Sequence, residues 1–575
     1  MNGQVFMSLV LCTFVVSIGF GGSDRVPKKY ITDEGTVVSL SIRSGGDFVV
    51  EGGLDWVLVD SMNNAYSMLS NVVDPLAFDP NSGVAAIIHR ANGGYGLGVW
   101  YNVTTDGGAT WIRISELCMG LVLSSTPNAT ISHPTGASSG VLWWASTELT
   151  PGPFDYLIYG FDILGVGVPY CVEDSFVKDP WSNNRIAAAD DNWCVWWLTR
   201  NVGSFYLWSY CAGLDQSEPW PAGDFSALGQ DAGLAYRNGT LYFGVFATFP
   251  GDPGIVFNVA YSASTDSGTT WSAWNGPNIG SGDWRTLPGI AGTVYTDWHD
   301  KNSFDMVVDA NGYVHFFGIL VDDYAMPSML AVAEIYETGS GWAANIIAEG
   351  LSSTTRTDYN GVDQMGYHVN SAISADGMAM AVNWLSAPAE GDTLPDIYGS
   401  VRHINSASWS AAENYTNTPD FAELLVQVAP TLRSDGNDNY TLFLARAYQC
   451  GEPPPPYPPN DLTCTNIFVG TKNLNIPLTE VDEELGVPAG YHLAQNYPNP
   501  FNPKTEIGFQ IMDYGLVLLT VYDLLGREIE TLVNEELAPG TYRRQWDASG
   551  YPSGVYFYQL STTNFVQTKR LVLLR

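Results

Sequence analysis

The 575-residue sequence predicts an all-β chain, made of a repeated group of strands followed by a small β-sandwich. Two observations support this fold class. Glycine (59), tyrosine (31) and tryptophan (19) are plentiful, whereas only 15% of the residues are charged. Short runs rich in Val, Tyr, Trp and Phe alternate with Gly, Asn, Asp and Pro clusters, without any long amphipathic helical stretch, which is typical of strands joined by turns. The chain is too long for one ordinary core, so we expect at least two domains.

The N-terminal residues are typical of an export signal. Residues 5–20, VFMSLVLCTFVVSIGF, contain no charge and are followed by small residues. The run is short for a membrane span, so residues 1–22 are predicted to be a secretory signal peptide, although no Lys or Arg precedes the apolar run. No other segment is suited to crossing a membrane, and no transmembrane segment is expected in the mature protein.

Six cysteines remain after the signal peptide, and an even number in an exported protein allows three disulfides. Cys194 with Cys211 could link neighbouring strands, and Cys450 with Cys464 could close a proline-rich loop. No pair has CxxC spacing, which argues against a zinc site. No cofactor is expected: Asp322-Asp323 could bind Ca²⁺ with loop carbonyls, but no EF-type ligand spacing supports it.

The net charge of −36 is unevenly distributed. Residues 492–575 hold 7 Lys/Arg and 8 Asp/Glu, whereas the preceding 491 residues hold 17 and 52. Such an acidic body repels nucleic acid and anionic lipid, so neither is an expected partner. It also disfavours an anionic substrate unless arginines gather locally.

A strand–turn–strand motif recurs along the body of the chain. Its turns lie at Gly83, at Gly140, around Asn192, at Gly239, Gly312 and Gly377, and around Gly436, with a mean period near 59 residues. A tryptophan follows several copies at a steady distance: Gly83 to Trp111 is 28 residues, Gly239 to Trp271 is 32, Gly312 to Trp342 is 30, and Gly377 to Trp409 is 32.

Each repeat is therefore predicted to be a four-stranded meander, and a ring of such meanders is a β-propeller. Seven copies suggest seven blades, although one poorly matched copy could be an insertion in a six-bladed ring. The propeller is predicted over residues 35–472. Residues 35–46 could supply the strand that closes the ring.

Two strings in these repeats, TTDGGATW at 104–111 and STDSGTTW at 264–271, resemble the Asp-box of sialidase-like (BNR-repeat) propellers. Segments 213–220 and 337–342 look like decayed copies. The matching residues are Thr104, Asp106, Gly108, Thr110, Trp111, Ser264, Asp266, Gly268, Thr270 and Trp271. We expect a structural role, because the aspartate can accept backbone N–H bonds across its own turn. The box is the third turn of its meander, so it lies on the face opposite the 2–3 loops and inter-blade connections.

The C-terminal residues change character. A linker is predicted over 473–492, followed by a sandwich of short alternating strands over 493–575. This stretch resembles the type A sorting domain of the type IX secretion system, also described as an Ig-like fold. The resemblance rests on Asn496, Pro498, Asn499, Pro500, Phe501, Asn502, Pro503, Gly526, Gly554, Tyr556 and Lys569. It implies export to the surface of a Bacteroidota-like bacterium, with the type IX machinery as partner; a retained Ig-like module is the alternative.

The sialidase resemblance does not extend to a sialidase active site. The Arg-Ile-Pro segment of that family is missing, because Arg185-Ile186 is followed by Ala187 in the third unit, and no arginine triad is assignable. Reactive residue types concentrate instead in the predicted loops of units 5 and 6. The ligand-binding candidates are Trp298, His299, Tyr324, Arg356, Tyr359 and His368. The candidate glycosidase carboxylates are Asp300, Asp322, Asp323 and Asp358.

Three functions remain open on the sequence. The leading hypothesis is a secreted or cell-surface module that binds glycans or proteins through its loop face. The second is a glycoside hydrolase that uses a carboxylate pair on that face. The third is a structural or adhesion scaffold. No phosphate-binding loop, HExxH or GxSxG string points to another chemistry.

Overall fold

A computed structural model shows an all-β chain in two compact units, whose main boundary lies between Thr479 and Glu480. The structure describes residues 49–51, 54–62, 74–90, 99–117, 127–134, 137, 139–148, 156–164, 170–174, 185–189, 193–201, 204–211, 214–219, 232–249, 258–279, 284–291, 293, 295, 297–298, 304–322, 330–339, 341–351, 369–386, 395–406, 408–417, 426–449, 465–477, 491–493, 496, 499, 501–511, 514–537, 540–563 and 565–574. The signal peptide and the predicted linker fall largely outside these ranges, so the domain boundaries given above stay predictions.

The first unit is a β-propeller whose blades are antiparallel meanders. Blade 1 is β3 (Leu76–Asp79), β4 (Val84–Arg90), β5 (Val99–Thr104) and β6 (Ile112–Glu116). Blade 2 is β7 (Asn128–Ser132), β8 (Val141–Glu148), β9 (Tyr156–Ile163) and β10 (Tyr170–Asp174). Blade 3 is β11 (Ile186–Ala188), β12 (Cys194–Asn201), β13 (Ser204–Cys211) and β14 (Leu214–Pro219).

Blade 4 has three strands, β15 (Ala232–Arg237), β16 (Thr240–Ala247) and β17 (Asn258–Ser264), followed by a short 3-10 turn, η2 (Trp284–Thr286). Blade 5 is β19 (Phe304–Val308), β20 (Val314–Val321), β21 (Leu330–Thr338) and β22 (Gly341–Glu349), with β18 (Asp297–Trp298) paired to the end of β20. Blade 6 is β23 (Asn370–Ser374), β24 (Ala379–Ser386), β25 (Asp396–His403) and β26 (Glu413–Asn414).

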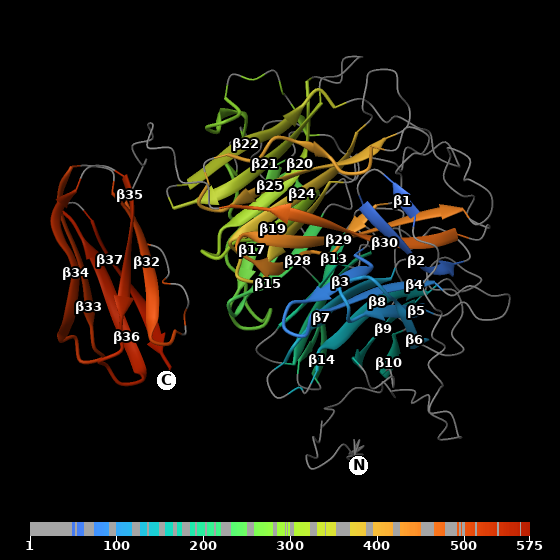
Figure 1. The fold of residues 1–575 in the computed structure, drawn as a ribbon, viewed down its shortest axis with the longest axis horizontal. Helices are drawn as coiled ribbons and strands as arrows, with labels where there is room; N and C mark the ends of the chain where they lie inside the picture. The colour runs from blue at the N-terminus through green and yellow to red at the C-terminus, as the bar shows by residue number, and fades with distance from the viewer. Residues whose placement is uncertain are drawn as a thin grey trace, which may run out of the picture. The chain divides into compact units, whose positions relative to one another are not determined.

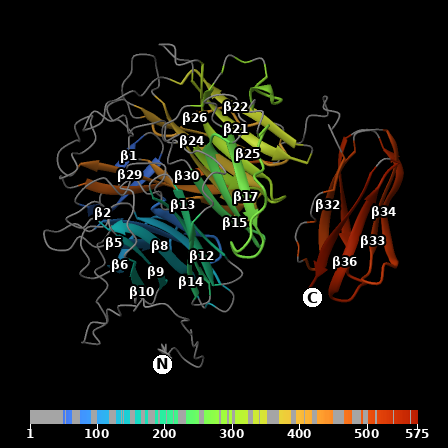
Figure 2. The ribbon, with the colours of Figure 1, turned by 180° about the vertical axis from the view of Figure 1, so that it is seen from behind.

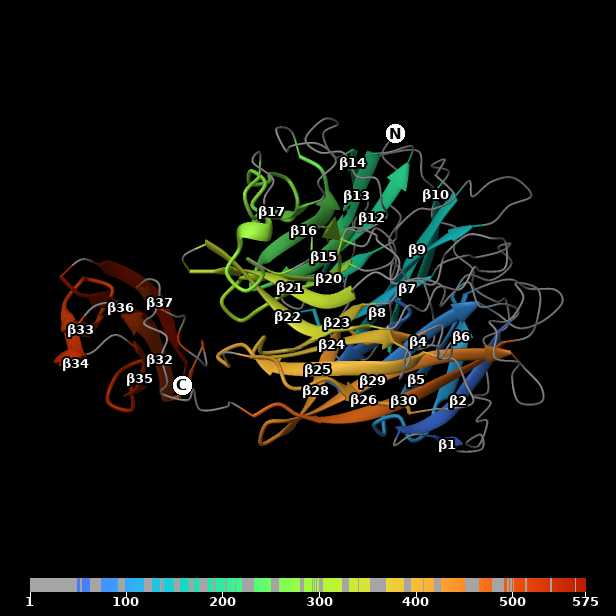
Figure 3. The ribbon, with the colours of Figure 1, turned by 90° about the horizontal axis from the view of Figure 1, so that it is seen from above.

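Blade 7 joins the two ends of the propeller chain. It holds β28 (Thr431–Gly436), β29 (Asn439–Gln449) and β30 (Thr465–Asn475), with β27 (Gln427–Val428) beside β29. Its outermost place is taken by β2 (Leu54–Met62), and β1 (Val49–Glu51) pairs with β2. In Figure 3 the blue β2 lies beside the orange β30, so the ring is closed by a strand from the opposite end of the chain.

The first strands of the blades follow one another around the ring centre. Within the described residues, each first strand contacts those of the blades before and after it, and β28 contacts β3. In Figure 1 the first strands β3, β7 and β28 lie toward the middle of the unit, and in Figures 1 and 2 the outer strands β6 and β10 lie at its edge. The predicted all-β propeller is therefore confirmed, and each of the seven predicted strand–turn–strand motifs is present in it. The blade count of the whole chain stays a prediction.

Aromatic and branched side chains fill the spaces between neighbouring blades. Trp143, Tyr159 and Trp197 form one such cluster between blades 2 and 3. Trp56 on β2 is fully buried and packs with residues of blades 6 and 7. Burial of apolar surface on both faces of each sheet is what stabilises a ring of sheets.

Two local predictions were wrong. The closing strand is β2, whereas residues 35–46, predicted for that place, lie outside the described residues. The sequence of β2, LDWVLVDSM, is the more apolar strand, and burial of its Trp56 and Val57 favours it there. The decayed Asp-box predicted at 213–220 is the strand β14, because Leu214 pairs with Cys211 across a two-residue connection.

The structure contains a disulfide between Cys194 and Cys211, which face each other on β12 and β13 with their Cα atoms 4.2 Å apart. Cys450 and Cys464, the other candidate pair, lie outside the described residues.

The second unit is a two-sheet sandwich. One sheet holds β31 (His492–Leu493), β32 (Lys504–Ile511) and β35 (Gly540–Asp547). The other holds β34 (Glu528–Leu537), β33 (Gly515–Tyr522), β36 (Gly554–Ser561) and β37 (Val566–Leu573). Trp546, Phe509 and Tyr558 lie in the core between them. The Ig-like sandwich predicted for this part of the chain is confirmed.

Candidate functional site

The two Asp-box strings form turns between the third and fourth strand positions of their blades. In the turn of blade 4, Ser264 and Thr270 donate hydroxyl hydrogen bonds to Asp266, at 2.8 and 2.6 Å, and the backbone N–H of Thr270 donates to the same carboxylate at 2.8 Å. These bonds lower the pKa of Asp266 to about 2, with the Thr270 hydroxyl contributing most. Thr104, Asp106 and Thr110 make the same set of bonds in blade 1. All donors to these carboxylates come from their own turn, which is the geometry of a structural element.

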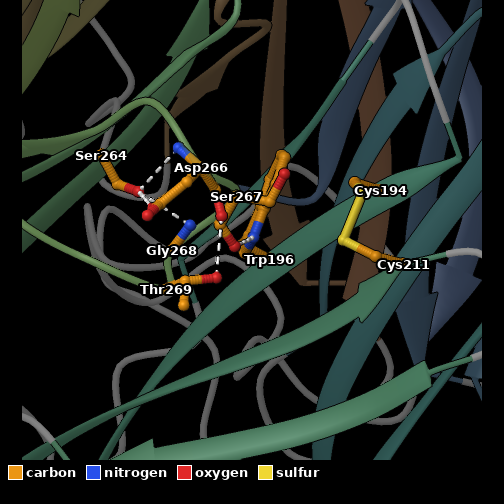
Figure 4. Close-up of a disulfide and its surroundings, with 8 residues drawn as sticks. All are labelled: Cys194, Trp196, Cys211, Ser264, Asp266, Ser267, Gly268 and Thr269. Atoms are coloured by element: carbon orange, nitrogen blue, oxygen red, sulfur yellow. Dashed lines mark hydrogen bonds between the residues drawn. A yellow bond between two sulfur atoms is a disulfide. The ribbon is translucent and has the colours of Figure 1, made fainter.

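The glycine and tryptophan of these turns contact the preceding blade. Gly268 has a positive φ of 91°, and a Cβ there would lie 3.3 Å from Leu207 of blade 3. The indole of Trp196, also on blade 3, donates to the Ser267 carbonyl at 3.0 Å; Figure 4 shows this contact beside the disulfide, whose Cys194 lies on the same strand as Trp196. Trp111 is buried with Phe443 and Val469 of blade 7. The turns therefore hold adjacent blades together, on the face we call the Asp-box face.

Most of the predicted ligand-binding and catalytic residues lie outside the described residues. They are His299, Asp300, Asp323, Tyr324, Arg356, Asp358, Tyr359 and His368. The backbone of Trp298 is described in β18, and Asp322 directly follows β20. Both positions lie at the 2–3 loop end of blade 5. We call the corresponding side of the ring, where the blades are also connected to one another, the connection face.

Asp322 belongs to a small acidic group on the connection face. The hydroxyl of Tyr295 donates to Glu349 at 3.1 Å. Burial raises the pKa of Tyr295, and the negative charges of Glu349 and Asp322 raise it further. One predicted carboxylate, Asp322, therefore shares an influence on Tyr295 with Glu349, which is not among the predicted site residues.

A second charged group lies at the ring centre, and it contains no predicted site residue. Asp74 precedes β3 of blade 1, Arg185 precedes β11 of blade 3, and Asp305 is the second residue of β19 in blade 5. These blades are not neighbours, so side chains from all three can meet only near the axis of the ring. Because first strands begin at the inter-blade connections, the group lies on the connection face. We call Asp74, Arg185 and Asp305 the central cluster.

Arg185 links the two carboxylates of the central cluster. Its Nη1 donates to both oxygens of Asp74, at 2.5 and 2.6 Å, and its Nη2 lies 3.5 Å from Asp305 Oδ1. The Arg185 side chain is 7% exposed, whereas Asp74 and Asp305 are 18% and 13% exposed. The carboxylates are thus partly open to solvent, while the guanidinium that pairs them is nearly covered.

Neighbouring blades fix the carboxylates in position. Ser371 on β23 of blade 6 donates its backbone N–H and its hydroxyl to Asp305 Oδ2, at 2.6 and 2.9 Å. The backbone N–H of Asp74 donates to Asn128 on β7 of blade 2, at 2.5 Å. Five blades therefore contribute to one polar group.

The pKa of Asp305 is raised by its surroundings. Burial raises its pKa above the ordinary value, and the charge of Asp74 adds to this effect, whereas Arg185 and Ser371 oppose it. A carboxyl group with a raised pKa beside a second carboxylate is a frequent property of functional sites.

Two further buried ion networks lie between blades. Glu334, on β21 of blade 5, accepts hydrogen bonds from His315, Asn345, Arg402 and Trp409 at 2.6, 2.7, 2.5 and 2.8 Å. His315 is 3% exposed in this network. The other network joins Asp60 on β2 to Arg113 and His89 of blade 1. The carboxylates of both networks are buried, Glu334 at 0% and Asp60 at 2% exposed, so we assign both networks to blade packing.

Two sorting-motif residues of the second unit pair with its edge strand β37, and a third is buried. Asn499 accepts a hydrogen bond from the backbone of Val572 at 2.8 Å, and Phe501 pairs in parallel with Leu573 of β37. Asn496 is buried and donates to the Tyr558 and Thr505 hydroxyl oxygens, both at 2.9 Å.

The remaining motif residues have local roles. The Pro503 carbonyl accepts from Ala548 at 2.9 Å and follows Asn502 through a cis peptide bond. Gly526 has a φ of 76° in the β33–β34 turn. Tyr556, two residues after Gly554, donates to the Pro552 carbonyl at 2.7 Å, and burial lowers the pKa of Lys569. Pro498 and Pro500 lie outside the described residues.

Comparison with known families identifies the second unit. Residues 495–574 match the family described as the secretion system C-terminal sorting domain. The protein is therefore exported to the cell surface or secreted, and its sorting domain interacts with the secretion machinery. Among the residues that the structure describes, no helix has the length and apolarity of a membrane span. No curated protein matches the chain.

Solved structures similar to this chain include propeller proteins of low sequence identity. The polysaccharide lyase PL25 ulvan lyase is 9% identical, with 70% of this chain and 93% of that chain covered and a TM-score of 0.38. A neuraminidase-like protein, subtype N10, of A/little yellow-shouldered bat/Guatemala/060/2010 is 9% identical, with 62% and 96% covered and a TM-score of 0.31. An exo-β-1,3-galactanase from Clostridium thermocellum is 10% identical, with 70% and 96% covered and a TM-score of 0.28. Scores this low carry no argument about the site.

Proposed function

We propose that this secreted or cell-surface propeller binds glycans at the ring centre of its connection face, through the central cluster. The observation that supports the proposal is the meeting of Asp74, Arg185 and Asp305, from three non-adjacent blades, in a group whose carboxylates remain partly exposed. This exposure distinguishes the central cluster from the two buried ion networks, because its carboxylates can still accept hydrogen bonds from a ligand.

The chemistry of the cluster suits a polyhydroxylated ligand. Carboxylate oxygens accept hydrogen bonds from sugar hydroxyls, and hydrogen bonds to charged groups are stronger than those between neutral groups. Asp305 and Asp74 are held by bonds from Ser371 and Arg185, so little side-chain entropy is lost when a ligand binds.

Glycoside hydrolysis is the second candidate function. The raised pKa of Asp305 favours it, since a carboxyl group that stays protonated at higher pH can act as a general acid. Asp74 would then be the second carboxylate, and Asp300, Asp322, Asp323 and Asp358 remain alternative partners from the loops.

A glycan array probed with the purified mature protein tests the proposal. We expect Asp74→Asn and Asp305→Asn each to weaken binding about tenfold to a hundredfold, because each variant replaces a charged acceptor of hydrogen bonds worth about 1.5–3 kcal/mol. Asp266→Asn is the matched control, since it makes the same substitution on the Asp-box face and should leave binding unchanged.

The outcomes separate the three hypotheses. Binding that both central-cluster variants weaken supports the proposal, and turnover of a chromogenic glycoside panel that Asp305→Asn abolishes supports hydrolysis. Binding that neither variant alters would contradict the role of the central cluster. A protein that binds no glycan and turns over no glycoside would favour the scaffold.

A further inference from the structure

The hydrogen bonding of Arg185 bears on which sugars the central cluster accepts, given the proposed function. A sugar acid is usually held by arginine, because the guanidinium fork matches a carboxylate through two parallel hydrogen bonds. In this protein, Nη1 of Arg185 is bonded to both oxygens of Asp74 and Nη2 faces Asp305. The arginine already has two carboxylates of the protein in the place of a ligand carboxylate.

The negative charge around Arg185 also disfavours the binding of a sugar acid. The described side chains gathered there are Asp74, Arg185 and Asp305 with Asn128 and Ser371, so Arg185 is the one cation among these five residues. With both carboxylates ionised the cluster has an excess negative charge, and the 491 residues before the sorting domain hold 52 acidic and 17 basic residues. A ligand carboxylate entering this group would face like charges, which costs several kcal/mol at a desolvated interface.

We propose that the central cluster selects uncharged sugars and rejects sugar acids, with Asp74 and Asp305 as the specificity-determining residues because they occupy Arg185. The inference rests on the proposed function of the same site. It assigns the two aspartates a role beyond direct contact: they neutralise the guanidinium that would otherwise attract an anionic glycan.

The test uses oligosaccharides that differ only in this charge. Uronic-acid oligosaccharides are arrayed beside their carboxyl-reduced counterparts, and the ratio of the two dissociation constants is measured for the wild-type protein. We expect the wild type to bind the reduced forms at least about tenfold more tightly. The preference should shrink as salt is raised, because the repulsion is electrostatic.

The double variant D74N/D305N should change that ratio. It keeps the shape of both side chains but leaves Arg185 with neutral partners, so the charge of the cluster changes from negative to positive. The preference for reduced forms should fall at least about tenfold or reverse. The single variant D74N should show a smaller change of the same sign, and Asp266→Asn should keep the wild-type ratio.

Different outcomes would overturn the inference and the proposed function. Equal or tighter binding of the uronic-acid forms by the wild type would overturn the inference and leave glycan binding in place. A double variant that is folded by circular dichroism and keeps the wild-type ratio would also overturn it. If the wild type binds neither form of any pair, the proposed function is overturned and the inference with it.

Discussion

Arg185→Met is expected to destabilise the propeller strongly, by about 3–5 kcal/mol in the free energy of unfolding. The substitution preserves most of the side-chain volume but leaves Asp74 and Asp305 near each other without a cation. Breaking a buried ion pair by removing one partner costs more than the pair itself contributes, since the remaining charge stays desolvated. Urea denaturation of the mature protein at neutral pH, with the variant and wild type in parallel, measures the difference.

The effect of Arg185→Met should depend on pH in one direction. Asp305 has a raised pKa in the folded wild type, and loss of the arginine raises the pKa further. A group with a raised folded pKa favours folding at low pH and loses that contribution as pH rises through the folded value. The ordinary pKa of an aspartate is 3.8. The stability deficit of the variant should therefore be small near that pH and grow as the pH rises toward neutrality.

A matched arginine tests this account. Arg433 pairs with Asp435 at 2.9 Å, but both side chains are about a third exposed, at 28% and 34%. We expect Arg433→Met to cost less than about 1 kcal/mol. Equal losses for the two variants, or a deficit for Arg185→Met that does not change with pH, would contradict the account of the central cluster.

Glu334→Gln is expected to have the second large effect, again about 3–5 kcal/mol. Glu334 is fully buried between blades 5 and 6 and accepts bonds from His315, Asn345, Arg402 and Trp409. Glutamine retains the shape but removes the charge that balances Arg402. Thermal and urea unfolding of the variant measure the loss, with Glu413→Gln as control, because Glu413 is 60% exposed in its pair with Lys472 and should change stability little.

The network predicts a stability window. Burial alone would raise the pKa of Glu334, but Arg402 and His315 outweigh it and lower the pKa to about 2 from 4.5, so this contribution is present above pH 4.5 and is lost toward pH 2. Burial would lower the pKa of His315, but Asp309 and Glu334 raise it above 6.5, so its contribution is full below that pH and is lost as pH rises through the folded value. The wild type should gain most from the network between about pH 4.5 and 6.5. A Glu334→Gln deficit that is constant from pH 3 to pH 9 would contradict this assignment.

The sequence predicts the fold well because its signals are local. Alternating apolar strands and glycine turns recur in register, and the turn at Gly83 or Gly312 needs a positive φ that glycine adopts without strain. Asp106 and Asp266 could be assigned to turns because their partners lie within four residues. The closing strand could not be assigned in this way, because its pairing joins Leu58 to Phe468 across the whole propeller.

The central cluster escaped sequence reading for the same reason. Asp74 and Arg185 are 111 residues apart, and each is a single charged residue just before a strand, which resembles an ordinary loop residue. Alignment of the repeats does reveal a pattern. A polar or charged residue stands at the start of the first strand in five of them: Asp74, Asn128, Arg185, Asp305 and Asn370. The predicted site residues lie in long loops instead, and most of them fall outside the described residues.

The most direct test of glycan binding at the ring centre is a crystal structure of the mature protein with an oligosaccharide that the array identifies. We expect sugar hydroxyls within hydrogen-bonding distance of the carboxylates of Asp74 or Asp305. A sugar bound on the Asp-box face, or on the sorting domain with the central cluster free of ligand, would contradict it.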